Sequence, residues 1–205
     1  MIKIEKAETY GWEATIRGMR NPMNSWDKSD SYKDGEYYCI GENDFGLMRR
    51  LMAAGSDHRK FMRMVAVWAD ITAPFYWWKE FDTYKIGTVA NSCSTMHKIH
   101  SRDITLEDFS VDHLTDYNKN ILLQIIRNLN LARKEFTESK NKDDWWQMIQ
   151  LLPSSYNQKR TVMLNYEVLR NMYHARKAHK LDEWREFCKW IETLPCSELI
   201  TEVAK

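Results

Sequence analysis

Residues 152–176, LPSSYNQKRTVMLNYEVLRNMYHAR, carry the pattern on which the interpretation of the whole chain depends. Pro153 interrupts a preceding helical pattern, and Ser154 or Ser155 can cap a helix that we expect to reach about Ala178. At about 100° per residue, an otherwise apolar stripe of that helix carries Asn165, Leu169, Met172 and Arg176. An arginine on such a stripe either extends to the surface and pairs with a carboxylate, or uses its planar fork to bind a phosphate or a pyrimidine carbonyl.

The rest of the chain is predicted to be mostly helical. Apolar residues recur with helical spacing, and turn residues separate the segments, over 43–55, 56–61, 74–81, 117–136, 143–151 and 181–194. In the longest of these helices, the expected buried face carries Tyr117, Ile121, Ile125, Leu129 and Phe136. Two stretches are typical of strands, Ile2–Glu5 and Met64–Ile71. Because the chain has no internal repeat and no Gly/Ser-rich linker, we expect a helix-dominated α+β fold and a single domain over residues 1–205.

The composition excludes several classes of protein. Lys and Arg total 30 against 29 Asp and Glu, so the formal charge is 30 − 29 = +1, which argues against a polybasic nucleic-acid-binding arm. A hydrophobic content of 43% is too high for intrinsic disorder. No apolar stretch approaches the roughly 20 residues of a membrane span, and the first residues do not resemble a secretory signal. We therefore expect a cytoplasmic protein that contacts neither membrane nor nucleic acid.

Histidines and cysteines are weaker candidates for a site. His97 and His100 could share a helical face and bind a metal with His113, but no acidic residue or cysteine completes a known zinc pattern, so we expect no metal. Cys93 lies in a polar loop where Lys85 or His97 could activate its thiolate, although a loop cysteine is usually inert. The cysteines form no C-x-x-C pair and are expected to be free thiols: Cys39, Cys93, Cys188 and Cys196.

Three blocks of the sequence together resemble the flavin-dependent thymidylate synthase family. The first comprises Leu51–Gly55, Phe61 and Ala73–Tyr76. The second, Thr83–Thr88 (TYKIGT), stands where the family has Arg-His-Arg-x-x-Ser. The third runs from Leu152–Pro153 to Asn165, Leu169, Asn171 and Arg176, with a spacing similar to that of the C-terminal helix that binds flavin and nucleotide. A weaker match, Arg17-x-x-Arg20 followed by Ser25-Trp26-Asp27, resembles an N-terminal segment in which the serine contacts flavin.

The resemblance implies a fold, an assembly and a reaction. The expected fold is helix-dominated α+β with a small antiparallel sheet, and the expected assembly is a homotetramer whose sites are shared between subunits. Members of the family bind FAD and reduce it with NADPH. The reduced flavin then assists transfer of a methylene group from methylenetetrahydrofolate to dUMP, without a protein nucleophile attacking the pyrimidine. The expected partner is therefore a small pyrimidine nucleotide.

The resemblance also assigns roles to single residues. Positions that bind the cofactor in the family are occupied by Ser25, Lys85, Asn165 and Asn171. Positions that bind the substrate are occupied by Lys79, Glu80, Asn91, Cys93, Lys159 and Arg176. Arg176 matches a clamp on the uracil edge and is the expected catalytic residue. The chain departs from the family at Thr83, Tyr84 and Thr95, which replace Arg, His and Arg.

These departures have a calculable effect on phosphate binding. A charge-assisted hydrogen bond to phosphate contributes about 1.5–3 kcal/mol, so losing two of them weakens binding by roughly two or more powers of ten. Lys85, Lys98 or Arg102 could compensate for the loss.

The sequence leaves three hypotheses open. The leading one is an enzyme that methylates dUMP to dTMP with FAD, methylenetetrahydrofolate and NADPH. The second is a non-catalytic protein that binds or sequesters a nucleotide on the same fold and has lost the flavin site, as Thr83–Lys85 suggests. The third is a divergent enzyme that uses Cys93 as a nucleophile on a pyrimidine.

Overall fold

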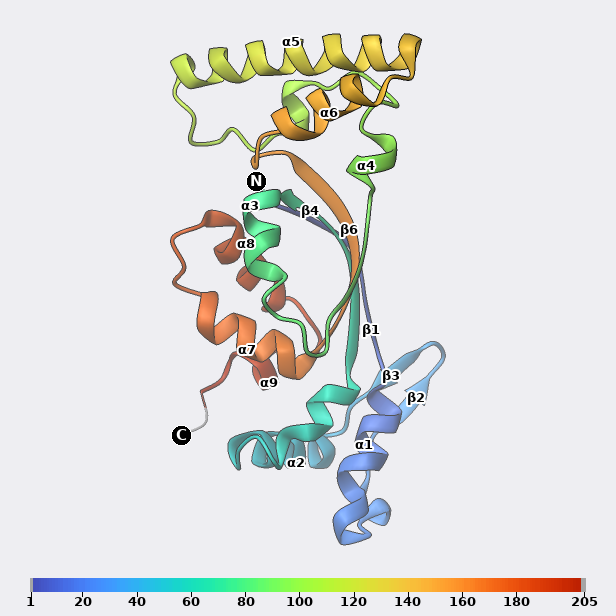
Figure 1. Cartoon of the computed structure of the whole chain (residues 1–205). Coiled ribbons are helices and arrows are strands. Elements are labelled where there is room, and N and C mark those ends of the chain that lie inside the picture. Colours follow the sequence, from blue (N-terminus) through green and yellow to red (C-terminus); the bar gives the residue numbers. More distant parts are fainter. Residues whose placement is uncertain (1, 204–205) are drawn as a thin grey trace. The chain divides into compact units, whose positions relative to one another are not determined.

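The computed structural model describes residues 2–203 and contains a four-stranded sheet with the strand order β1-β4-β6-β5. Strands β1, β4 and β6 of this sheet are labelled in Figure 1. Its strands are β1 (Lys3–Tyr10), β4 (Ala66–Pro74), β5 (Val89–Ser92) and β6 (Asn157–Asn165). A separate antiparallel hairpin consists of β2 (Tyr32–Asp34) and β3 (Tyr37–Cys39). The two strands predicted from the sequence, at Ile2–Glu5 and Met64–Ile71, are confirmed as β1 and β4, with shifted ends.

Helices make up most of the remaining described chain. They are α1 (Trp12–Arg20), α2 (Glu42–Ala53), α3 (Phe75–Phe81), α4 (Thr95–Lys98), α5 (Asp116–Ser139), α6 (Lys142–Leu151), α7 (Tyr166–Arg176), α8 (Asp182–Ile191) and α9 (Glu198–Thr201). Short 3-10 helices are η1 (Asn21–Met23), η2 (Trp26–Lys28), η3 (Arg59–Met64) and η4 (Leu106–Asp108). The helices predicted over 43–55, 74–81, 117–136, 143–151 and 181–194 are confirmed within a few residues.

The helix predicted from Ser154 or Ser155 to Ala178 is wrong over its first half, which is β6. Gln158, Val162 and Leu164 are buried while Thr161 is exposed, so the segment has the alternating burial of a strand. The helix α7 starts only after Asn165, whose side-chain Oδ1 accepts the Val168 N–H at 2.9 Å. This side-chain cap fixes the helix start.

The chain divides into two compact units. Within the described residues, the first comprises 2–3, 71–83 and 91–161, and the second comprises 4–70, 84–90 and 162–203. Both β4 and β6 contribute residues to each unit. The prediction of one domain over residues 1–205 stays a prediction.

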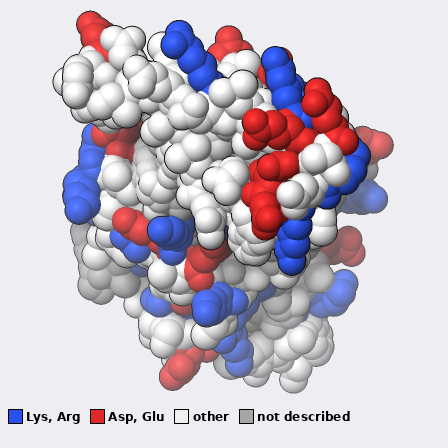
Figure 2. All heavy atoms as spheres, turned by 45° about the horizontal axis from the view of Figure 1, so that its top comes forward, with Lys and Arg blue, Asp and Glu red and all other residues white. Residues whose placement is uncertain are grey.

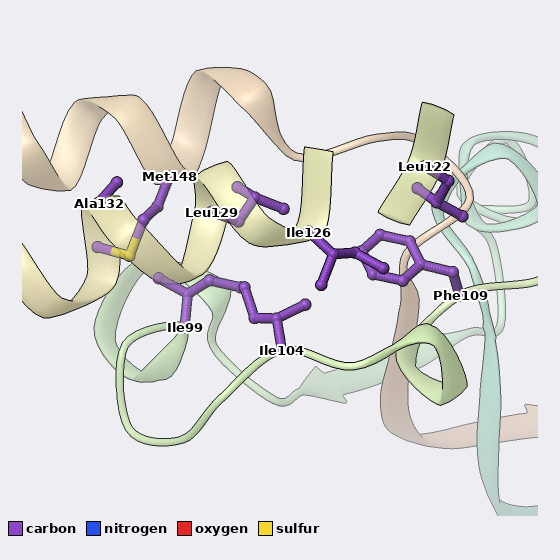
Figure 3. Packing of buried hydrophobic residues seen from close by; sticks show 8 residues of the cluster. All are labelled: Ile99, Ile104, Phe109, Leu122, Ile126, Leu129, Ala132 and Met148. Carbon is purple, nitrogen blue, oxygen red and sulfur yellow. The ribbon is translucent and has the colours of Figure 1, made fainter. Parts of the chain in front are cut away.

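In the first unit, α5 and α6 pack side by side over a buried apolar cluster (Figures 1 and 3). The cluster consists of Ile99, Ile104, Phe109, Leu122, Ile126, Leu129, Ala132 and Met148. The predicted buried face of α5 is therefore rotated from the observed one. Tyr117 is 75% exposed and Ile121 43% exposed, because the neighbouring stripe through Leu122 and Ile126 is the one that faces the cluster.

In the second unit, α7 packs against η3, α8 and α9. The side chains of Leu169 and Met172 on α7 are fully buried, as the sequence pattern predicted for that face. The backbone N–H of Tyr166 donates to the carbonyl of Val65 at 3.1 Å, which attaches the start of α7 to the segment before β4. The same unit contains a buried ion pair between Arg20 and Asp44.

Candidate functional site

Arg176, in the last turn of α7, is held by two aromatic residues of the second unit. Its Nε–H donates to the hydroxyl of Tyr84 at 3.0 Å. The centre of its guanidinium lies 4.9 Å from the ring centroid of Trp184 and 5.7 Å from that of Tyr84. Trp184 is fully buried, whereas Arg176 is partly exposed. The arrangement holds a planar cation against aromatic faces and leaves part of it at the surface, where it can meet an anion or a carbonyl.

Residues 84–88, the part of the second block (the signature segment, 83–88) that belongs to the second unit, therefore contact the C-terminal helix α7 and its cap. Gly87 has φ +78°, and a Cβ at this position would come within 2.4 Å of the Asn165 Nδ2. The Thr88 hydroxyl donates to the Tyr84 carbonyl and closes the segment as a turn. Two blocks that the sequence resemblance assigned to ligand binding are thus brought together by direct contacts.

The four predicted cofactor-binding residues differ in their surroundings. Asn165 uses Oδ1 to cap α7, while its Nδ2 faces Gly87. Lys85 and Asn171 are exposed, and the backbone carbonyl of Ser25 accepts the Arg20 Nη1–H at 3.1 Å. All four lie in the second unit.

Two of these residues carry exposed donors of the kind that a flavin requires. The exposed Asn171 amide and Lys85 ammonium can donate to ring carbonyls or to a pyrophosphate. The missing Cβ of Gly87 leaves room for the Asn165 amide itself, whose Nδ2 would otherwise lie 2.4 Å from it.

The segment that carries Ser25 is fixed by a buried carboxylate. Asp44 accepts hydrogen bonds from Arg20 Nε at 2.6 Å and from the hydroxyls of Ser29 and Ser31 at 2.7 and 2.6 Å. Burial alone would raise the pKa of Asp44, but the hydrogen bonds from Ser31, Ser29 and Arg20 together lower it below its ordinary value. Arg20 therefore has a structural role here and orders the chain around Ser25. A neighbouring groove of about 440 Å³ is lined by residues that include Arg17, Trp26 and Tyr38.

The predicted substrate-binding residues, apart from Arg176, belong to the first unit. The backbone N–H of Cys93 donates to the carbonyl of Lys159 at 2.9 Å, so these two residues are neighbours. Asn91, on β5, and Cys93 are exposed, and Lys159, on β6, is half-buried. Lys79 is exposed on α3 and lines a groove of about 260 Å³ with residues that include Trp78 and Arg160. Glu80 is half-buried on the same helix.

Two residues of β6 that are not among the predicted binding residues make specific contacts in this unit. The Arg160 guanidinium lies 4.2 Å from the Trp78 ring centroid, and its Nε–H donates to Gln158 Oε1 at 3.0 Å. Gln158 in turn donates to the Cys93 carbonyl at 2.8 Å. The helical interpretation of this segment hid these contacts, because residues 158 and 160 share a face on a strand but not on a helix.

The histidines and the other cysteines do not form a comparable group. Between residues 2 and 203, no cluster of three or more His, Cys, Asp or Glu side chains has the arrangement of a metal site. The His100 ring packs against Phe136 with centroids 4.9 Å apart. Burial raises the pKa of the Cys188 and Cys196 thiols to about 11, which keeps them protonated and unreactive at neutral pH.

The surface charge is mixed. Figure 2 shows Lys and Arg interspersed with Asp and Glu over the face in view. Among residues 2–203, no helix has the length and apolar character that a membrane span requires.

Solved structures with the same fold exist, although no protein-family model and no curated protein matches the sequence significantly. Flavin-dependent thymidylate synthase ThyX from Helicobacter pylori, complexed with FAD and dUMP, is similar with a TM-score of 0.70 at 16% identity over 97% of each chain. A second structure of ThyX from Helicobacter pylori with FAD and dUMP has a TM-score of 0.69 at 16% identity, over 98% of this chain and 97% of that chain. The UMP/dUMP methylase PolB from Streptomyces cacaoi, bound with 5-Br dUMP, has a TM-score of 0.62 at 15% identity, over 94% of this chain and 89% of that chain.

These similarities extend over nearly the whole chain and concern its fold. The protein has the helix-dominated α+β fold of the flavin-dependent thymidylate synthases, with a small antiparallel sheet. The fold predicted from the sequence is confirmed.

Proposed function

We propose that the protein binds dUMP and, with FAD, methylates it to dTMP in pyrimidine deoxynucleotide metabolism. The observation that carries the proposal is the contact between Arg176 and Tyr84, which joins the C-terminal helix to the signature segment. The Trp184 ring also lies against this guanidinium, 4.9 Å from its centre. A preoriented fork suits a pyrimidine, whose edge presents carbonyl oxygens. The structurally similar ThyX from Helicobacter pylori, which was solved with FAD and dUMP, supports this choice of ligands.

Each predicted site residue has a role in this proposal. Arg176 contacts the uracil edge as the catalytic residue, and the other substrate-binding residues are Lys79, Glu80, Asn91, Cys93 and Lys159. Ser25, Lys85, Asn165 and Asn171 hold FAD. When it is bound and reduced by NADPH, FAD supplies the reducing equivalents for converting the methylene group of methylenetetrahydrofolate into a methyl group.

The proposal also includes a homotetramer in the cytoplasm. Mass photometry of the purified protein at nanomolar concentration measures the assembly directly. A monomer under these conditions would contradict this part of the proposal.

A visible absorption spectrum tests the central claim. We expect purified protein, alone or after FAD is added and excess removed, to show bound flavin that NADPH bleaches under anaerobic conditions. With dUMP and methylenetetrahydrofolate added, chromatography should then detect dTMP. Protein that retains no FAD and forms no dTMP would contradict the enzymatic function.

A second function on the same fold is a nucleotide-binding protein without flavin. The observation that favours it is the tyrosine at position 84, where the family has a histidine. Tyr84 is uncharged, and its hydroxyl accepts the Nε–H of Arg176. Here we expect dUMP to raise the melting temperature of flavin-free protein. A ligand at 100 times its Kd stabilises the folded state by about 2.7 kcal/mol, which a thermal shift detects readily. No shift with any pyrimidine nucleotide would exclude this alternative.

A further inference from the structure

Gln158 occupies the centre of a hydrogen-bonded chain in the first unit. It is only 8% exposed, and its backbone carbonyl accepts the Trp78 indole N–H at 2.9 Å. Its side-chain Oε1 accepts the Arg160 Nε–H at 3.0 Å, and its Nε2 donates to the Cys93 carbonyl at 2.8 Å. A buried amide with partners on both ends has one orientation available.

Arg160 determines that orientation. Its guanidinium lies 4.2 Å from the Trp78 ring centroid and donates through Nη1 to Asp82 at 2.7 Å. Because the Arg160 Nε–H can only donate, it requires the oxygen end of the Gln158 amide. The nitrogen end must therefore face Cys93.

Both backbone polar groups of Cys93 are thereby attached to β6. The N–H donates to the carbonyl of Lys159 at 2.9 Å, and the carbonyl accepts from Gln158. The side chain of Cys93 remains exposed. Segment 91–95 contains the last two residues of the short strand β5 and the three residues that follow it. The two hydrogen bonds of Cys93 therefore define where this segment lies relative to Lys159.

We infer that Gln158, oriented by Arg160, is a positioning residue that holds segment 91–95 against Lys159 and so sets the affinity for the pyrimidine nucleotide. The inference rests on the proposed function, because that function places Asn91, Cys93 and Lys159 at the nucleotide. Gln158 and Arg160 themselves act through the segment. Neither residue belongs to the predicted site.

Two conservative variants test the inference. In Gln158→Glu, the pair with Arg160 is kept, but the donor to Cys93 becomes a carboxylate that repels its carbonyl. In Arg160→Lys, the positive charge near Asp82 is kept, but the Nε–H that orients Gln158 is lost. Gln150→Glu, on the exposed side of α6, is the matched control. Melting temperatures of all variants establish that they are folded.

Two readouts report different steps of the argument. The rate of thiol modification by a chromogenic disulfide reports the position of Cys93, the exposed cysteine of the chain, and Cys93→Ser identifies its signal. Titration calorimetry with dUMP gives the Kd. We expect Gln158→Glu to change the Cys93 rate at least threefold and to raise the Kd about tenfold, as the loss of one good hydrogen bond in a binding site would. Arg160→Lys should change both in the same directions, and Gln150→Glu should change neither by more than twofold.

The outcomes separate the inference from the proposed function. Folded variants with the unaltered protein's thiol rate, or with its Kd, would overturn the inference while dUMP still binds. Failure of the unaltered protein to bind dUMP overturns the proposed function instead, and the dependence of the affinity on Gln158 is lost with it. The thiol rates then still establish whether Gln158 positions Cys93.

Discussion

The side chain of Arg176 loses little conformational entropy when a ligand binds, because the fold already restricts it. Tyr84 accepts its Nε–H, and the rings of Tyr84 and Trp184 lie beside its plane. Fixing a long side chain costs up to about 2 kcal/mol of rotamer entropy. Here folding already fixes the side chain, so ligand binding does not incur this cost again. Tyr84 stands where the family has a histidine, so one side chain of the altered signature has acquired a supporting role.

Replacing Arg176 by Lys should weaken dUMP binding about 10- to 100-fold, because a point charge replaces the planar fork and its aromatic stacking. Titration calorimetry measures the Kd. Arg63→Lys, on an exposed arginine of the same unit, should leave it unchanged. A Kd for Arg176→Lys within twofold of the unaltered protein would remove Arg176 from the site.

At the scale of elements, the connection between α1 and α2 depends on one buried carboxylate. The backbone N–H groups of Asp30 and Ser31 donate to Asp44 at 3.2 and 3.1 Å, in addition to its side-chain partners. Arg20 extends the network by donating to the carbonyls of Ser25 and Lys28. Polar contacts, rather than apolar burial, order residues 25–31, since η2 contains no buried residue.

Asp44→Asn should lower the free energy of unfolding by about 3–5 kcal/mol, because it leaves the Arg20 charge buried without its counter-ion. Urea denaturation monitored by tryptophan fluorescence measures the change. The same substitution at exposed Asp57 serves as the control and should alter stability by less than about 0.5 kcal/mol. Similar losses for both variants would mean that the buried pair contributes little.

The elements also show what the sequence could and could not reveal. The long amphipathic helix α5 was predictable from its apolar repeat. Its cap, Thr115, which accepts the Asn118 N–H, was identified only in the structure. The strand β6 was missed because its sequence, NQKRTVMLN, does not alternate between polar and apolar residues and runs directly into the apolar stripe of α7. The buried face of α5 was misassigned because apolar residues occupy two adjacent stripes, and only tertiary packing selects between them.

The candidate site was predictable only in part, for a related reason. The spacing on α7 predicted an arginine at position 176 on the same helix as Leu169 and Met172, and the structure shows it partly exposed there. Its partner Tyr84 could be identified only as a departure from a motif, since their contact joins residues 92 positions apart. The contacts of Gln158 and Arg160 could not be predicted without knowing that residues 157–165 form a strand.

At the scale of the whole molecule, titratable groups that are partly or fully buried predict how stability depends on pH. Burial and Arg170 lower the pKa of His174 below 6.5. Asp108 resembles Asp44: burial would raise its pKa, but hydrogen bonds from Arg102 and Thr105 lower it below 3.8. In each case the unfolded chain binds protons more readily than the folded one.

Stability should therefore fall in two stages as the pH decreases. The first fall begins as the pH drops through 6.5, where unfolded His174 is protonated, and the second as it drops through 3.8, where unfolded Asp44 and Asp108 are protonated. Urea titrations at intervals between pH 8 and pH 3 measure this. His174→Gln should flatten only the upper stage, and an unchanged upper stage in that variant would contradict the assignment to His174.

The way in which the backbone alternates between the two units limits how this protein can be rearranged. It passes from one unit to the other at 3/4, 70/71, 83/84, 90/91 and 161/162. Neither unit is one continuous segment of the chain. Exchanging a unit with that of another protein would therefore require a compatible join at each of these places, several of which lie inside hydrogen-bonded strands. A single substitution, by contrast, needs no junction between the units.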